Sequence, residues 1–374
     1  MRLVVTGMGM LTSLGYGATG TCAAIRAGLS RAQELDSVGP GGEPLVGHPV
    51  TDYAEGFLQA GAWLRLGAGA LADLLHSACL PLASDNFWLQ TGLTVLAPRI
   101  DPERFLGWMS GTREELLRDF ALPLSGLVEL PFAEERAEAL GLGHCGLGEA
   151  MKRVGKEIES GRLARAIILG ADSYLDPMSL DWLAGNRRLK HAEQPVGVLP
   201  GEAAVCILVE SPVAARARNA FIGACVEGVV VGHIPERPLG KREQTAPDTW
   251  VAPSAPRSGR ALAECVEQLL SHAKKPFAGH LIADLNGETW KSTSWGHAQV
   301  LLNPHVDFDR CRLTIPAECL GEIGAASGPL GVGLAVSDFV RGGASSEQAI
   351  ICSLSDAGQV SAVLLRSPEA DSKR

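Results

Sequence analysis

Two segments in opposite halves of the chain share one plan. They are residues 145–173, "CGLGEAMKRVGKEIESGRLARAIILGADS", and residues 326–356, "ASGPLGVGLAVSDFVRGGASSEQAIICSLSD". Each begins with small residues, continues as a predicted helix of about four turns, turns at glycine and ends in an apolar strand. A helix followed by a strand that is apolar on both faces indicates a layered α/β protein. The repetition therefore predicts a duplicated fold with pseudo-twofold symmetry, divided into halves 1–215 and 216–374.

Other apolar runs predict the remaining strands of the two halves. In the first half they are "RLVVTGMG" (2–9), "GLVELPF" (126–132) and "AAVCILVES" (203–211). In the second half they are "AFIGACVEGVVVG" (220–232), "GHLIADLNGE" (279–288), "QAIICSL" (348–354) and "SAVLLRS" (361–367).

The first strand leads into "VVTGMGMLTSLG" (4–15), which has the beginning of a dinucleotide-binding fingerprint. That fingerprint needs a third glycine three residues after the second, and here the position is Thr12. It also needs an acidic residue at the end of a second strand, whereas Glu34 and Asp36 lie in a stretch typical of a loop. We therefore interpret Gly7 and Gly9 as residues that shape a turn, and we expect no nucleotide cofactor.

Composition excludes several classes of function. Hydrophobic residues make up 46% of the chain and charged residues 20%, which favours a large buried core. A net charge of −9 argues against general nucleic-acid binding. No apolar run is long enough to span a membrane, and the amino terminus is unlike a signal peptide. The nine cysteines and nine histidines are scattered, so we expect a reduced cytoplasmic protein without a metal site.

Four motifs, spread in order over nearly the whole chain, resemble the β-ketoacyl synthase family of condensing enzymes. They are "RLVVTGMGMLTSLG" (2–15), "AIILGADS" (166–173), "GVLPGEAAVCILVE" (197–210) and "LGEIGAASGPLGVGLAV" (320–336). The resemblance implies a thiolase fold, a duplicated five-layered α-β-α-β-α architecture with two central helices. It also implies acyl-thioester chemistry and either a homodimer or a heterodimer with a paralogous synthase.

The family's nucleophile is a cysteine at the start of the first central helix, which leaves two candidates here. "CGLG" makes Cys145 match the family pattern Cys-x-x-Gly, and a helix start favours a thiolate. Counting back without a gap from "GADS" instead places His144 in the nucleophile position. Cys145 is then a buried structural cysteine.

The family's other catalytic positions have changed in a consistent direction. By resemblance, Asn286 and Glu322 replace its two histidines, Ala317 replaces its lysine, and Asp356 replaces the phenylalanine of the closing loop. Gly358 of that loop is kept. An ionised Glu322 would raise the pKa of a nearby thiol and repel a malonyl carboxylate. Ala317 leaves no lysine in the expected place, so we predict that decarboxylative condensation is deficient.

The resemblance also implies that several polar side chains converge at the mouth of the family's active site. They are Asp284, Asn286, Glu288, Glu322 and Asp356. Three interpretations stay open: a new acid–base site, a cation site or a solvated rim.

Three functions follow. The first is a non-catalytic or acyl-binding partner or scaffold, paired with an acyl carrier protein or with a paralogous synthase; a role as adaptor in a bacterial secretion cluster is a variant of it. The second is an acyltransferase that uses Cys145, and the third is an active 3-oxoacyl synthase. Arg187, Arg188 and Lys190 form a basic cluster on a predicted exposed loop. This cluster would either meet an acidic carrier protein or be a solvated charge run.

Overall fold

One long mixed sheet organises the molecule. The computed structural model describes residues 3–105, 110–234, 250–273, 275–341 and 347–368. Strands of the first half are β1 (Leu3–Thr12), β5 (Thr91–Ala97), β6 (Ala137–Gly141), β7 (Arg165–Ser173) and β8 (Glu202–Glu210). Strands of the second half are β9 (Ala224–His233), β10 (His280–Ala283), β11 (Arg312–Thr314), β12 (Gln348–Leu354) and β13 (Gln359–Arg366).

The two halves of the sheet repeat the same topology. The hydrogen-bonded order is β11-β10-β12-β13-β9-β1-β8-β7-β5-β6, and the short β2 (Gly15–Tyr16) pairs with β1. Numbered within its own half, each side runs 1-5-4-2-3 from the junction of β9 with β1. In each half the fifth strand pairs antiparallel with both neighbours, and the other pairs are parallel. This duplication confirms the predicted symmetry.

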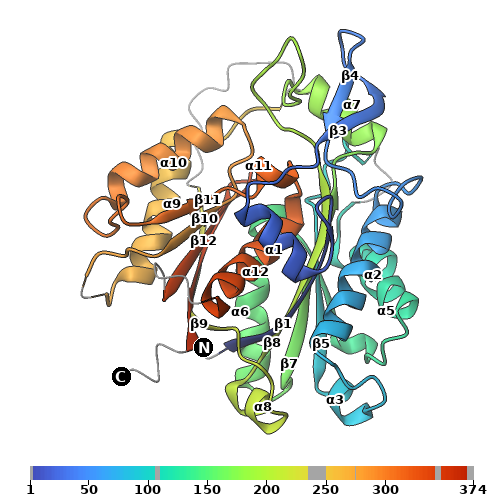
Figure 1. The fold of residues 1–374 in the computed structure, drawn as a ribbon, viewed down its shortest axis with the longest axis vertical. Coiled ribbons are helices and arrows are strands. Elements are labelled where there is room, and N and C mark those ends of the chain that lie inside the picture. Colours follow the sequence, from blue (N-terminus) through green and yellow to red (C-terminus); the bar gives the residue numbers. More distant parts are fainter. Residues whose placement is uncertain (1–2, 106–109, 235–249, 274, 342–346, 369–374) are drawn as a thin grey trace.

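Two buried helices of 14 residues each lie between the sheet halves (Figure 1): α6 (Gly146–Glu159) and α12 (Ser327–Val340). Each follows a single 3₁₀ turn, and the two turns are in contact. The turns begin at Gly143 and Gly324, whose φ angles of 52° and 47° favour glycine. The paired central helices bear out the thiolase architecture.

Outer helices cover the remaining sheet faces and complete the five layers (Figure 1). In the first half α2 (Ala60–Ser77) packs on β1, β7 and β8, with α5 (Leu122–Leu127) beside it. In the second half α9 (Ala255–Leu270) packs on β9 and β13, and α10 (Thr289–Leu302) packs on α9. The smaller elements are α1 (Ala18–Arg26), α3 (Asp85–Leu89), α4 (Arg113–Leu116), α7 (Pro177–Gly185), α8 (Pro212–Ala217), α11 (Ala317–Leu320), β3 (Gln33–Val38) and β4 (Pro44–Gly47).

Two expectations about local structure were wrong. Residues 126–132 are not a strand, because they end α5 and continue as a loop whose Leu130 packs into the core. Gly7 and Gly9 lie inside β1 rather than in a turn. A Cβ on Gly9 would come within 2.1 Å of the carbonyl oxygen of Ala70, so glycine lets α2 approach the strand. The division of the chain after residue 215 falls within α8 and stays a prediction.

Candidate functional site

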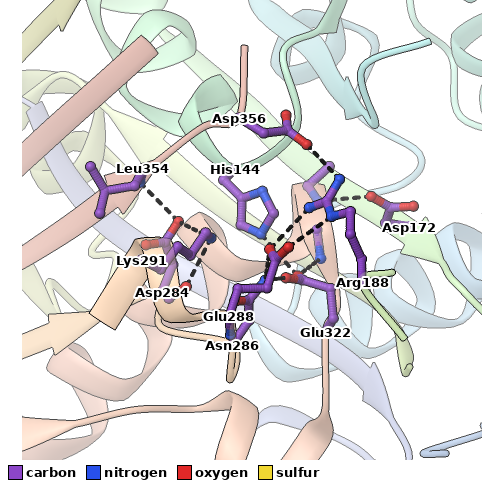
Figure 2. Close-up of polar contacts among 12 residues, drawn as sticks. His144, Asp172, Arg188, Asp284, Asn286, Glu288, Lys291, Glu322, Leu354 and Asp356 are labelled. Atoms are coloured by element: carbon purple, nitrogen blue, oxygen red, sulfur yellow. Dashed lines mark hydrogen bonds and ion pairs between the residues drawn. The ribbon is translucent and has the colours of Figure 1, made fainter. Parts of the chain in front are cut away.

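A cluster of charged side chains lies where the two halves meet, at the turns that precede α6 and α12 (Figure 2). Loops and helix starts supply most of them, while the rigid strands behind fix the positions of those loops. We call this cluster the charge network; its members are His144, Arg188, Asp284, Asn286, Glu288, Lys291, Glu322 and Asp356.

Glu322 is the centre of the charge network. Its Oε1 atom lies 2.9 Å from Nε2 of His144 and accepts a 2.7 Å hydrogen bond from the backbone N–H of Gly324. Its Oε2 atom accepts a 2.5 Å hydrogen bond from Nδ2 of Asn286. The carboxylate is 3% exposed, so these three donors replace water around it.

The contact between His144 and Glu322 shifts both protonation equilibria. Burial alone would raise the pKa of Glu322, but the charge and hydrogen bond of His144, together with Lys291, hold that pKa well below its usual range. Burial also lowers the pKa of His144, and the Glu322 carboxylate more than offsets it, so the pKa is raised. An imidazolium paired with a carboxylate is therefore the favoured state.

Lys291 supplies a buried cation that the sequence analysis missed. Its Nζ atom donates to the backbone oxygen of Asp284 at 2.9 Å and to Oδ2 of the same residue at 3.1 Å. Burial lowers the pKa of Lys291, but the negative charges of Asp284, Glu322 and Glu288 outweigh this effect, so the pKa is raised. The expectation that Ala317 would leave the site without a lysine was wrong, because the ammonium comes from α10 instead. The signal was a lone lysine in the helix that follows "DLNGE" (284–288).

Arg188 joins two acidic residues at the outer side of the network. Its Nε and Nη2 atoms donate to the two oxygens of Glu288, at 2.7 and 2.9 Å, and its Nη1 atom donates to Asp356 at 2.9 Å. The guanidinium lies 4.9 Å from the ring centre of Trp182 and 4.3 Å from that of Trp250. Arg187 and Lys190 are exposed as expected, but Arg188 is buried, so the prediction of one exposed basic cluster was wrong for it.

The thiol of Cys145 is hydrogen-bonded to the backbone rather than to Glu322. Its thiol donates to the backbone oxygens of Gln359 and Ser353, at 3.3 and 3.6 Å. Burial and then the nearby Asp284 carboxylate raise its pKa far above the usual value. Its neighbour His144, rather than Cys145, contacts Glu322, and Glu322 in turn accepts a hydrogen bond from Asn286. The negative group that acts on the thiol is thus Asp284, not Glu322 as expected.

Asp356 and Gly358 lie on the turn between β12 and β13. The turn is closed by its own backbone, since the N–H of Gly358 donates to the oxygen of Ser355 and the N–H of Ser355 donates to that of Gln359. Gly358 has a φ of 82°. Asp356 extends toward Arg188, and the guanidinium holds the pKa of this carboxyl below its usual range although burial opposes the shift.

Most side chains of the charge network are shielded from solvent and pair with one another, so the network differs from the solvated rim that was one of the three interpretations. Asn286, Glu288 and Glu322 are buried, the Asp284 side chain is 6% exposed, and Asp356, at 27%, has the most exposed carboxylate of the network. Within the described ranges, no group of three or more His, Cys, Asp or Glu side chains is arranged to hold a metal ion. Three cations face four carboxylates, so most of the charge is balanced by the chain itself.

A small cavity lies behind Glu322, beside Ala317. Its volume is about 20 Å³, enough for about one water molecule. Asp284, Asn286 and Glu322 contribute polar atoms to its wall, and Cys352 and Ile351 close its apolar side. An acyl chain does not fit in this volume.

Solved structures with the same fold include several polyketide ketosynthases. The ishigamide ketosynthase/chain length factor matches with a TM-score of 0.71 and 18% identity, over 98% of this chain and 99% of that chain. A type II polyketide synthase acyl-carrier protein in complex with its ketosynthase bound to the hexaketide matches with a TM-score of 0.74 and 15% identity, over 98% and 99%. The ketosynthase from module 6 of the bacillaene synthase from Bacillus subtilis 168 matches with a TM-score of 0.75 and 10% identity, over 98% of this chain and 72% of that chain. The chain has the thiolase fold of ketosynthases.

Comparison by sequence, in contrast, finds no relatives of this chain. No family model matches the chain, and no curated protein matches it. Among the helices of the described residues, none has the length and apolar character needed to cross a membrane.

Proposed function

We propose that this protein is a ketosynthase-fold partner or scaffold that does not perform decarboxylative condensation. One observation carries the proposal. Three donors of the site, His144, Asn286 and the N–H of Gly324, already donate to the carboxylate of Glu322. A side chain of the protein thus holds the place where a condensing enzyme must stabilise developing negative charge.

The chemistry of the missing step supports this assignment. Loss of carbon dioxide from a malonyl thioester leaves negative charge on the thioester oxygen, which requires free donors in the transition state. Glu322 acts as a donor only when protonated, and its lowered pKa keeps it ionised near neutral pH. The same negative charge repels an incoming malonyl carboxylate.

Acyl transfer through Cys145 has no support in the geometry. A thioester forms on a thiolate, and burial raises the pKa of the Cys145 thiol. The side chain in contact with Glu322 is His144, so we assign the nucleophile position of the fold to His144 and a structural role to Cys145. The acyltransferase and the active synthase then become outcomes of the assay below.

The proposed partners are an acyl carrier protein and a second thiolase-fold chain. Two structural neighbours support this choice, a ketosynthase/chain length factor and an acyl-carrier protein in complex with its ketosynthase. Among the described strands, β6 ends the hydrogen-bonded order of the sheet, so its outer edge is where a strand of another copy or of a paralogue would pair.

Two measurements test the proposal together. Purified protein is incubated with acyl and malonyl carrier thioesters, alone and with a competent ketosynthase, and products are identified by mass spectrometry. Sedimentation velocity on the same mixtures reports assembly. The expected result is no β-ketoacyl product from the protein alone and a complex with the synthase or the carrier. Product formation by the protein alone, abolished by Cys145→Ala, would overturn the proposal.

A further inference from the structure

The guanidinium of Arg188 presents its two edges to two different carboxylates of the charge network. Glu288 takes the edge formed by Nε and Nη2 with two hydrogen bonds. The second edge, formed by Nη1 and Nη2, is left for Asp356, which accepts one 2.9 Å bond from Nη1. Trp182 and Trp250 lie against the guanidinium and fix its plane. A fixed fork of this kind is suited to an oxyanion.

Asp356 makes one ion pair with the residues that the structure describes. Its partner in that ion pair is Arg188, and the turn that carries Asp356 is closed by backbone hydrogen bonds of Ser355, Gly358 and Gln359. Asp356 is 27% exposed, compared with 6% for Arg188. The carboxylate can therefore move into water while the turn keeps its shape and Glu288 keeps Arg188 in place.

We propose that Arg188 is an anion-binding residue for phosphate groups and that Asp356 occupies its outer edge as an internal competitor. A phosphate presents three oxygens and about −1.5 to −2 charges as a monoester, so it can use both Nη atoms where Asp356 uses one. Exposed Arg187 and Lys190 lie within two residues of Arg188 in the sequence and add positive charge to the same loop. Phosphate binding releases Asp356 and opens the outer side of the network.

The phosphate has two sources, free phosphate and the phosphopantetheine arm of a carrier protein. Only the second source rests on the proposed function. The binding of inorganic phosphate and of 4′-phosphopantetheine therefore has to be measured separately, with pantetheine, which lacks the phosphate, as the matched control ligand.

Isothermal titration of the full chain tests the proposal with three variants. Asp356→Asn removes the internal competitor, and we expect inorganic phosphate to bind at least about tenfold more tightly than to the unmodified chain. Asp181→Asn, which removes one exposed carboxylate on α7, should leave phosphate affinity unchanged. Arg188→Lys added to Asp356→Asn should lose the gain, since lysine keeps the charge but not the fork.

The outcomes separate this inference from the proposed function. If Asp356→Asn unfolds at the same temperature as the unmodified chain and binds phosphate no more tightly, the anion site is wrong. It is equally wrong if the double variant keeps the gain, or if Asp181→Asn matches it. Phosphopantetheine binding with the same gain, and no binding of pantetheine, supports the carrier as source. β-Ketoacyl product from the unmodified chain would refute the proposed function and leave the phosphate result standing.

Discussion

Nε2 of His144 lies 2.9 Å from a carboxylate oxygen of Glu322, while the thiol of the adjacent Cys145 donates to the backbone oxygens of Ser353 and Gln359. One residue step along the 3₁₀ turn before α6 thus separates a side chain inside the charge network from one outside it. The distinction determines which chemistry the site can support, and it leads to the following predictions.

Glu322→Gln should destabilise the protein by about 3–5 kcal/mol, because it removes one partner of a buried ion pair and leaves His144 and Lys291 with excess positive charge. Urea unfolding measures the change. The matched control is Glu157→Gln, in the exposed pair with Arg162, which should change stability by less than about 1 kcal/mol. Equal effects for the two variants would contradict a central role for Glu322.

The stability conferred by His144 should depend on pH in a defined direction. Its folded-state pKa is raised, so its contribution is full below the unfolded value of about 6.5 and is lost as pH rises through the folded value. Glu322 has a lowered pKa, so its contribution is present above its unfolded value of about 4.3 and fades at more acidic pH.

The difference in unfolding free energy between the unmodified chain and His144→Gln should therefore be larger at pH 6 than at pH 9. Using the difference cancels other titrating groups, such as buried His48, whose pKa of about 4 gives the opposite trend. A difference that grows from pH 6 to pH 9 would show that His144 is neutral in the folded state.

Alkylation should distinguish the cysteines of the folded protein. At pH 8, iodoacetamide should modify exposed Cys79 and leave Cys145 unmodified, because the Cys145 thiol is buried and its pKa is raised. Peptide mass spectrometry locates the adducts, and the same reaction in denaturant shows that Cys145 can be detected when accessible. Rapid labelling of Cys145 in the native state would revive the acyltransferase hypothesis.

Glycine substitutions test the packing of β1 against α2. Gly9→Ala should cost about 3 kcal/mol, since a Cβ would overlap the backbone of Ala70. Gly20→Ala, in the exposed part of α1 with open space around it, should instead stabilise by about 0.5–1 kcal/mol. Thermal unfolding distinguishes the two signs, and a neutral Gly9→Ala would mean that α2 lies farther from the strand.

Much of the fold followed from local pattern. The repeated helix and strand units at 145–173 and 326–356 indicated duplication because helix period and buried strands are encoded within a few residues of each other. Strands β5, β6 and β11 of the long sheet were missed, and 126–132 was mistaken for a strand. Strand β5 is apolar because both faces of the sheet are covered there. Segment 126–132 is apolar because its Leu130 packs into the core from a loop. Composition alone does not separate the two cases.

The sequence predicted which acidic and amide side chains meet at the site, but it did not predict the basic side chains that pair with them. Motif positions placed Asn286, Glu288 and Glu322 together, as the structure has them. Lys291 and Arg188 enter from a different helix and a distant loop, so no local spacing connects them with Glu322. Whether a buried carboxylate is neutral or paired depends on such long-range partners, which is why the protonation of Glu322 needed the structure.

The most direct test of the account is whether the purified protein releases carbon dioxide from a malonyl carrier thioester and joins the remaining two carbons to an acyl group. We predict no product above the rate without protein, at pH 7, because the donors of His144, Asn286 and Gly324 are held by ionised Glu322. Formation of a β-ketoacyl thioester that depends on the protein and disappears with Cys145→Ala would contradict the account.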